Sequence, residues 1–147
     1  MSKLVHIING PNLNLLGERE PGQYGQRSLQ EILDDMSYVA EGCGVSLSHI
    51  QSNSEGDLID AVQTAGREGI DWIILNPAGY THTSVALRDA LLAVEIPFIE
   101  VHLSAVSARE PFRQVSYFAD IAEGAISGFR GESYLLALQA IINRIEP

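Results

Sequence analysis

Glu100 and His102 are a pair of residues whose types and spacing suit proton-transfer chemistry. They stand two positions apart in the apolar segment Phe98–His102, and positions i and i+2 of a β-strand share one face. A carboxylate in that place can orient an imidazole that gives or takes a proton at a reacting atom. The same spacing also fits a simple hydrogen-bonded pair, and a lone histidine at a strand end is by default structural.

Polar residues follow two other apolar segments. Asn9-Gly-Pro-Asn12-Leu-Asn14 follows the first, and Asn76-Pro-Ala-Gly-Tyr-Thr-His82-Thr-Ser84 follows another. Each cluster has a plain interpretation: glycine and proline make turns, asparagine satisfies loop backbone, and His82 caps the next helix. Because the carboxyl ends of parallel strands meet at one edge of a sheet, three such clusters together predict a single site.

Several other chemistries lack their residues. The four histidines show no metal-site spacing, and we interpret His6 and His49 as structural. The glycines match no nucleotide-binding fingerprint, and no serine lies on a Gly-x-Ser-x-Gly turn. The single lysine, Lys3, begins the first strand at the opposite edge, and Cys43 is the single cysteine. We expect no metal, no cofactor and no lysine imine.

Composition excludes further classes of protein. Nine Lys and Arg against nineteen Asp and Glu give a net charge of −10, which argues against a nucleic-acid partner and against docking on an anionic membrane. No apolar run is long enough to span a bilayer, and the first apolar run is too short for a signal peptide. We expect an acidic cytoplasmic protein with an apolar share of 46%, enough to form a core.

Strand-length apolar runs alternate with segments of helical period. The predicted strands are Lys3–Asn9, Val45–Gln51, 72–75, Phe98–His102 and a weaker one at 125–129.

Helix signals separate these runs. A capping box at Ser28 and Glu31 opens a helix that ends at Gly42 and Gly44. Further helices follow Ser54, cover 85–94, and close the chain through 135–145.

This alternation predicts an α/β fold: a flavodoxin-like, doubly wound, five-stranded parallel sheet in three α/β/α layers, in one domain over residues 1–147. The segment between the first strand and the first helix is much longer than the usual roughly two to six residues. It carries Arg19, Tyr24 and several Gly and Pro residues. We interpret it as a lid.

The chain resembles the type II 3-dehydroquinate dehydratase family over nearly its whole length. The segments that carry the resemblance are Asn9-Gly-Pro-Asn-Leu-Asn-Leu-Leu-Gly17, Arg19-Glu-Pro21, Tyr24-Gly25, Gln51-Ser-Asn53, Asn76-Pro77, Tyr80-Thr-His-Thr-Ser-Val-Ala-Leu-Arg-Asp89, Ile96-Pro-Phe-Ile-Glu-Val-His-Leu-Ser104 and Arg109-Glu-Pro-Phe-Arg113.

A few positions depart from the family pattern. Ala78-Gly79 stands where the family often has Gly-Ala or Ala-Ala, Ala105 replaces a frequent Asn, Ser107 a frequent His, and Ser133 a frequent Gly. None of these changes removes a group to which the resemblance assigns chemistry.

The resemblance implies a hydro-lyase that removes water from 3-dehydroquinate by anti elimination through an enolate, giving 3-dehydroshikimate in the shikimate pathway to chorismate and aromatic amino acids. It implies that Tyr24 is the base, that Asn12 stabilises the enolate through a water, and that His102, held by Glu100, protonates the leaving hydroxide. A free tyrosine ionises near pH ~10, so a tyrosinate base needs a cation beside it. We predict Arg19 as the main cation and Arg109 as a second.

The resemblance also implies how the substrate is bound. Its binding groups are the side chains of Asn76, His82 and Arg113 and the backbone N–H groups of Leu103 and Ser104. The family forms trimers gathered into a dodecamer, in which Asp89 reaches a neighbour's site. From the residues alone, Asp89 is an outward-pointing helix carboxylate paired with Arg88 or another arginine.

Two other functions of the same fold remain in view. A phosphate-accepting receiver domain needs acidic residues at the ends of the first and third strands, where this sequence has Asn9 and Asn76. A flavin carrier needs a Ser/Thr/Gly-rich phosphate loop after the first strand, which Asn-Gly-Pro-Asn-Leu-Asn does not supply.

Overall fold

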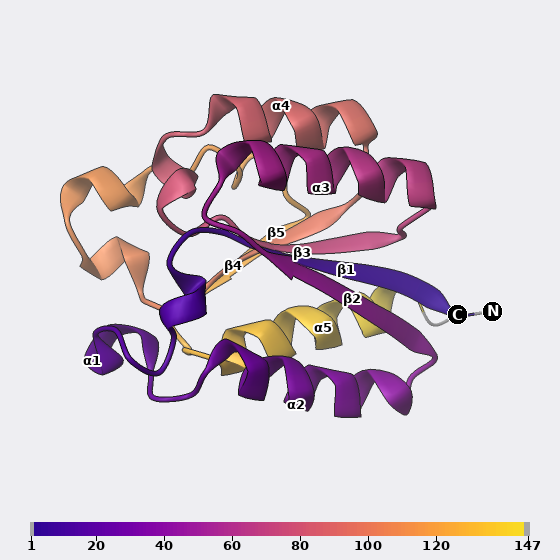
Figure 1. Ribbon diagram of the computed structural model, residues 1–147, viewed down its shortest axis with the longest axis horizontal. Coiled ribbons are helices and arrows are strands. Elements are labelled where there is room, and N and C mark those ends of the chain that lie inside the picture. The colour runs from indigo at the N-terminus through magenta and orange to yellow at the C-terminus, as the bar shows by residue number, and fades with distance from the viewer. Residues whose placement is uncertain (1, 146–147) are drawn as a thin grey trace.

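Short segments rich in β-branched residues form one five-stranded parallel sheet in the computed structural model, which describes residues 2–145 (Figure 1). The strands are β1 (Lys3–Asn9), β2 (Val45–Gln51), β3 (Trp72–Asn76), β4 (Phe98–His102) and β5 (Gly124–Ser127). Their order is β2-β1-β3-β4-β5, which is the flavodoxin-like arrangement. The predicted fold class is confirmed.

Three strand boundaries differ from the prediction, and one of them is the start of β5, at Gly124 and not at 125. β5 ends at Ser127 and not at 129, because Gly128 has a φ of +96°, a left-handed conformation that leaves the β region. β3 extends one residue further than predicted, because Asn76 pairs with Asn9 of the neighbouring strand. This last pair places two asparagines side by side at the carboxyl edge of the sheet.

Long helices cover both faces of the sheet (Figure 1). α2 (Leu29–Glu41) and α5 (Glu132–Ile145) lie together on one face, and α3 (Glu55–Glu68) and α4 (Val85–Val94) lie on the other. Each pair buries an apolar stripe against the sheet and so forms a core layer, with Met36 and Leu138 fully buried in the first and Leu58 and Leu87 in the second. Within residues 2–145, no helix has the length and apolar character needed to cross a membrane.

Serine side chains fix where three of these helices begin. The predicted capping box is present: Ser28 Oγ accepts from the backbone N–H of Glu31 at 3.2 Å, and Glu31 Oε1 accepts from that of Ser28 at 3.1 Å. Ser54 and Ser84 cap α3 and α4 through their side chains alone: each Oγ accepts from a backbone N–H, that of Asp57 at 3.2 Å and that of Leu87 at 3.0 Å.

Short turns gather at the carboxyl edge of the sheet (Figure 1). They are the one-turn helix α1 (Pro21–Tyr24) and the 3₁₀ turns η1 (Leu13–Leu15), η2 (Ala78–His82), η3 (Val106–Ala108) and η4 (Pro111–Gln114). α1 was not predicted as a helix. Pro21 starts it at a position where a missing N–H costs nothing.

Candidate active site

A polar cavity of about 170 Å³ lies beyond the carboxyl ends of β1, β3 and β4. It contains every predicted site residue except Glu100 and Asp89: its lining includes Asn12, Arg19, Tyr24, Asn76, His82, His102, Leu103, Ser104 and Arg113. The three polar clusters of the sequence therefore meet in one place. Arg109 also lines the cavity.

The loops that follow β1 and β3 approach each other closely just before the residues that line this cavity. Gly10 donates its backbone N–H to the Asn76 carbonyl at 2.8 Å, and a Cβ at Gly10 would lie 2.5 Å from the Pro77 carbonyl oxygen. Glycine is therefore required there. Asn12 follows in a left-handed conformation with φ +69°, and its N–H donates to Asn53 Oδ1 at 2.9 Å.

Glu100 and His102 make the contact that their spacing predicted. A ring nitrogen of His102 lies 2.6 Å from Glu100 Oε2, and the two residues are 7% and 1% exposed. A carboxylate only accepts, so this ring nitrogen carries a hydrogen and the other one is left for the cavity. Glu100 lies behind His102, which explains why it does not line the cavity.

Ser116 is a partner of this pair that the sequence did not reveal. Its Oγ lies 2.7 Å from Glu100 Oε2 and accepts from the backbone N–H groups of Phe118 and Ala119 at 3.0 and 3.2 Å. The hydroxyl proton is therefore directed to Glu100. The other carboxylate oxygen, Oε1, is buried without a partner in the described part of the chain.

Tyr24 has two arginines beside it, and their arrangement differs from the prediction. Arg109 Nη1 donates to the Tyr24 hydroxyl at 2.7 Å, whereas the Arg19 guanidinium carbon lies 4.8 Å from the ring centroid, over its face. The charge of Arg19 is also shared with Glu20 at 3.4 Å. The cation at the hydroxyl is thus Arg109, and Arg19 is at the ring.

His82 and Arg113 stand on the turns that follow β3 and β4. His82 Nδ1 donates to the Val115 carbonyl at 2.8 Å, which leaves the other nitrogen for the cavity. His82 is not the cap of α4, because Ser84 holds that place. Arg113 Nε donates to Glu110 at 3.0 Å.

The carboxyl of Glu110 moderates the arginine charge of the cavity. A hydrogen bond with its own backbone N–H, and then the Arg113 guanidinium, lower the pKa of the Glu110 carboxyl, so it is ionised near neutral pH. It also lies 3.7 Å from Arg109 Nε. Arg19, Arg109 and Arg113 nevertheless give the cavity an excess of cations in a protein of net charge −10, as an anionic substrate requires.

Asn76 belongs to a buried network that the sequence also did not reveal. Asn76 Nδ2 donates to the Tyr134 hydroxyl at 2.9 Å, and Tyr134 donates to Asn9 Oδ1 at 2.5 Å. All three side chains are almost fully buried. Tyr134 comes from α5, which the apolar pattern predicted only as a core helix.

Asp89 is exposed on α4, outside the cavity. Arg88 pairs with Asp120, with Nη2 to Oδ2 at 2.9 Å. Asp89 points outward as expected, but among the described residues no ion pair joins it to Arg88 or to another arginine.

Two of the departures from the family pattern have a visible packing role. Ser133 is fully buried and its hydroxyl accepts from the backbone N–H of Phe129 at 3.2 Å. Ala105 packs against Gly128, within 3.5 Å of where a Cβ would stand. Ala78 has a φ of +52°, so it occupies a left-handed position that glycine adopts without strain.

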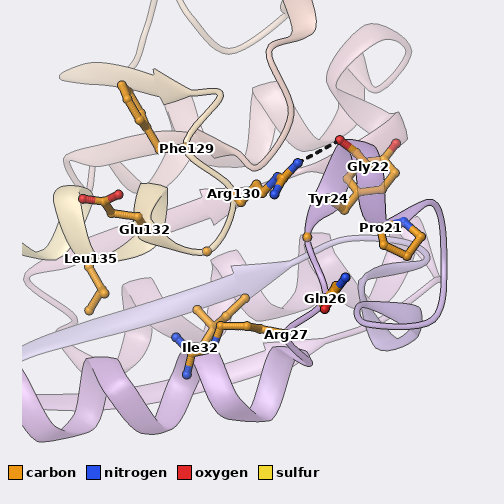
Figure 2. Close-up of a pocket in the computed structure, with 12 residues that line it drawn as sticks. Pro21, Gly22, Tyr24, Gln26, Arg27, Ile32, Phe129, Arg130, Glu132 and Leu135 are labelled. Atoms are coloured by element: carbon orange, nitrogen blue, oxygen red, sulfur yellow. Dashed lines mark hydrogen bonds between the residues drawn. The ribbon is translucent and has the colours of Figure 1, made fainter.

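A larger cavity, of about 540 Å³, is lined in part by residues of α1 and the turn that follows it, and it shares only Tyr24 with the polar cavity. Figure 2 shows Arg130 reaching from the loop after β5 toward α1, where its guanidinium donates to the Gly22 carbonyl at 3.1 Å. Apolar groups of Ile32, Phe129 and Leu135 form much of the wall. The polar cavity, though smaller, holds the groups that can transfer protons, so we assign the chemistry there.

Within residues 2–145, no cluster of three or more His, Cys, Asp or Glu is suited to a metal ion.

Comparison with known proteins gives one consistent family. The profile of the family described as Dehydroquinase class II matches residues 3–142. The chain is 58% identical over 144 residues to a 3-dehydroquinate dehydratase of Legionella pneumophila (strain Corby), covering 98% of this chain and 99% of that protein. It is 57% identical over 147 residues to one of Yersinia pestis (strain Pestoides F), covering 99% and 97%.

Solved structures agree. The type II dehydroquinase from Butyrivibrio crossotus DSM 2876 superposes with a TM-score of 0.93 at 38% identity, covering 97% of this chain and 98% of that one. The type II dehydroquinase from Propionibacterium acnes gives a TM-score of 0.92 at 33% identity with the same coverage.

Proposed function

Because this chain belongs to the class II dehydroquinase family, we propose that its polar cavity converts 3-dehydroquinate to 3-dehydroshikimate by anti elimination of water through an enolate. The chain is an enzyme of the 3-dehydroquinate dehydratase type, a hydro-lyase. One observation carries the assignment of the site: an arginine-bonded tyrosine and a buried Glu–His pair line or support the same small cavity. Elimination of water needs these two proton-transfer groups.

Proton abstraction falls to Tyr24. The base must remove a proton α to a ketone, and a phenolate does so only where positive charge stabilises it. Arg109 donates to the Tyr24 hydroxyl at 2.7 Å from a side chain that is 10% exposed. Arg19 adds a second cation over the ring. Asn12, acting through a water, stabilises the enolate oxygen.

His102 is the acid that protonates the leaving hydroxide. Hydroxide is a poor leaving group, so it must be protonated as it departs. Glu100 holds one ring nitrogen of His102 at 2.6 Å, and its charge stabilises the imidazolium. The other ring nitrogen donates the proton. Ser116 donates a second hydrogen bond to the same Glu100 oxygen, Oε2, and so helps to hold the carboxylate in place.

The remaining cavity groups bind the substrate. Arg113, His82 and Asn76, with the backbone N–H groups of Leu103 and Ser104, fix its carboxylate and hydroxyls. The reaction serves the shikimate pathway toward chorismate and aromatic amino acids, in the cytoplasm, and no metal, flavin or imine takes part.

We further infer an oligomer of trimers, forming a dodecamer, in which Asp89 reaches the site of a neighbouring subunit. Asp89 shares one face of α4 with Val85 and Leu92, at positions i−4 and i+3. Val85 is 56% and Leu92 48% exposed. An acid flanked by exposed apolar side chains on one helix face supports a protein–protein contact.

One assay tests the proposed function. Adding 3-dehydroquinate to the purified protein should raise the absorbance of the conjugated enone at a rate that chelator leaves unchanged. Treatment with borohydride in the presence of substrate should leave the enzyme active, because no imine forms. A protein that produces no enone would overturn the proposed reaction, and activity that chelator removes and a divalent ion restores would overturn its metal independence.

A further inference from the structure

A tyrosine outside the cavity is hydrogen-bonded to one of the cavity's asparagines. Asn9 and Asn76 are paired residues at the ends of adjacent parallel strands, and the Tyr134 hydroxyl from α5 lies between their side chains. It is 2.9 Å from Asn76 Nδ2 and 2.5 Å from Asn9 Oδ1. Tyr134 and Asn9 are 0% exposed and Asn76 is 2% exposed, so water does not compete for these bonds.

The direction of both hydrogen bonds of the Tyr134 hydroxyl is fixed. Asn76 Oδ1 accepts from the backbone N–H of Ala78 at 3.1 Å, so the amide nitrogen must be the atom that faces Tyr134. That nitrogen only donates, so the Tyr134 oxygen accepts from it and sends its single proton to Asn9 Oδ1. If the Asn76 amide were reversed, its oxygen would face the Tyr134 oxygen, whose proton already goes to Asn9, and its nitrogen would face the Ala78 N–H. Neither contact would be a hydrogen bond.

The hydrogen bond to Tyr134 determines which Asn76 hydrogen remains for the cavity. An amide nitrogen has two hydrogens, and Tyr134 takes one of those on Asn76. The second is the hydrogen that Asn76, which lines the cavity, has left to offer a substrate oxygen.

Tyr134 keeps this arrangement over the whole working pH range. Burial raises the pKa of the Tyr134 phenol far above its ordinary value, and the hydrogen bond from Asn76 offsets this only in part. The hydroxyl therefore always has a proton for Asn9. Tyr134 is thus unsuited to be a base.

We propose that Tyr134 is a positioning residue for substrate binding, which fixes the Asn76 amide so that its free N–H meets a substrate oxygen. The inference rests on the proposed function and adds to it a residue that does not touch substrate. Tyr134 acts through Asn76 alone, so its effect must disappear when Asn76 is removed.

The test is a double-mutant cycle on the full-length enzyme with 3-dehydroquinate as substrate. Tyr134→Phe keeps the ring and removes the hydroxyl; KM should rise about three- to tenfold, the effect of losing one well-formed hydrogen bond, while kcat changes less than about twofold. In an Asn76→Ala background the same substitution should leave KM unchanged. Equal effects of Tyr134→Phe in both backgrounds, or no effect in the first, would overturn the inference.

Two controls separate positioning from stability. Ile141→Val shortens a buried side chain on the same helix and should lower the melting temperature without moving KM. If Tyr134→Phe does not fold, Asn9→Ala offers a second test, because it removes the acceptor of the Tyr134 proton and so loosens the Asn76 amide. The rise in KM caused by Asn9→Ala must also vanish in the Asn76→Ala background. A rise that persists in that background overturns the inference. Wild-type enzyme with no turnover would instead refute the proposed function, so the two failures are distinguishable.

Discussion

The Tyr24 hydroxyl and the Arg109 guanidinium meet across 85 positions of sequence, and for the proposed mechanism this contact predicts that Arg109 is the main cation beside the base. A single cation within ~4 Å stabilises a phenolate by about 4 kcal/mol at an effective dielectric near 20. Arg109 holds that place at the oxygen, while Arg19 faces the ring.

Removing the Tyr24 hydroxyl should abolish the reaction without abolishing binding. Tyr24→Phe is expected to lower kcat by several orders of magnitude, because the proposed base for the α proton is lost, while a product analogue binds with similar affinity in calorimetry. If the variant keeps more than about a tenth of wild-type turnover, less than ~1.4 kcal/mol of the barrier depended on that hydroxyl, and the assignment is wrong.

The two arginines should differ in their effect. Arg109→Ala is expected to reduce kcat by about a hundredfold, comparable with losing one preorganised charge-stabilising donor, and Arg19→Ala by clearly less. Steady-state kinetics of the two variants, with the exposed Arg67→Ala on α3 as control, makes the comparison. A larger loss of kcat in Arg19→Ala than in Arg109→Ala would instead support the prediction from sequence that Arg19 is the main cation.

At the scale of elements, the turn after β3 carries conformational strain. Ala78 has a φ of +52°, which is unfavourable for a residue with a Cβ. Ala78→Gly should therefore raise the free energy of unfolding by about 1 kcal/mol in urea titration. The same substitution at Ala137, which is buried in α5 with helical backbone, should lower it; stabilisation by both would show that strain is not the cause.

The β1–β2 pair makes the fold sensitive to mild acid. Burial lowers the pKa of the His6 imidazole, and Glu68 and the hydrogen bond with Ser48 offset this only in part. A histidine with a lowered folded pKa takes up its proton more readily when unfolded, so stability is full above pH ~6.5 and falls below it, at most by about 1.4 kcal/mol per pH unit.

Urea unfolding at pH 7.5 and 5.5 measures this loss. His6→Gln should lose less stability than wild type between the two values. An equal loss in His6→Gln and wild type would assign the sensitivity to other groups.

At the scale of the whole molecule, the proposed shared site links activity to assembly. Asp89→Ala should lower kcat/KM about tenfold if the carboxylate binds in a neighbour's cavity, since a charged hydrogen bond is lost. Glu95, exposed beyond the other end of α4, provides the control in Glu95→Ala. Light scattering under assay conditions gives the oligomeric state, and a fully active monomer would contradict the shared site.

The amino-acid sequence by itself determined most of the secondary structure and the fold class. Its β-branched runs located the sheet, and the capping box at Ser28 fixed the start of α2, because both signals are local: each depends on residues within a turn or a strand of one another. The spacing of Glu100 and His102 was likewise enough to predict their contact, since a strand puts alternate residues on one face.

Only the tertiary structure decided which distant groups meet. Arg109 at Tyr24, Ser116 at Glu100 and Tyr134 between two asparagines join segments that are 85, 16 and, for Asn76 and Asn9, 58 and 125 positions apart. No local pattern encodes these contacts, because they depend on how α5 and the loops after β4 pack onto the sheet. A serine or tyrosine in an apolar stretch has the same appearance in sequence whether its hydroxyl is structural or directs a substrate-binding side chain.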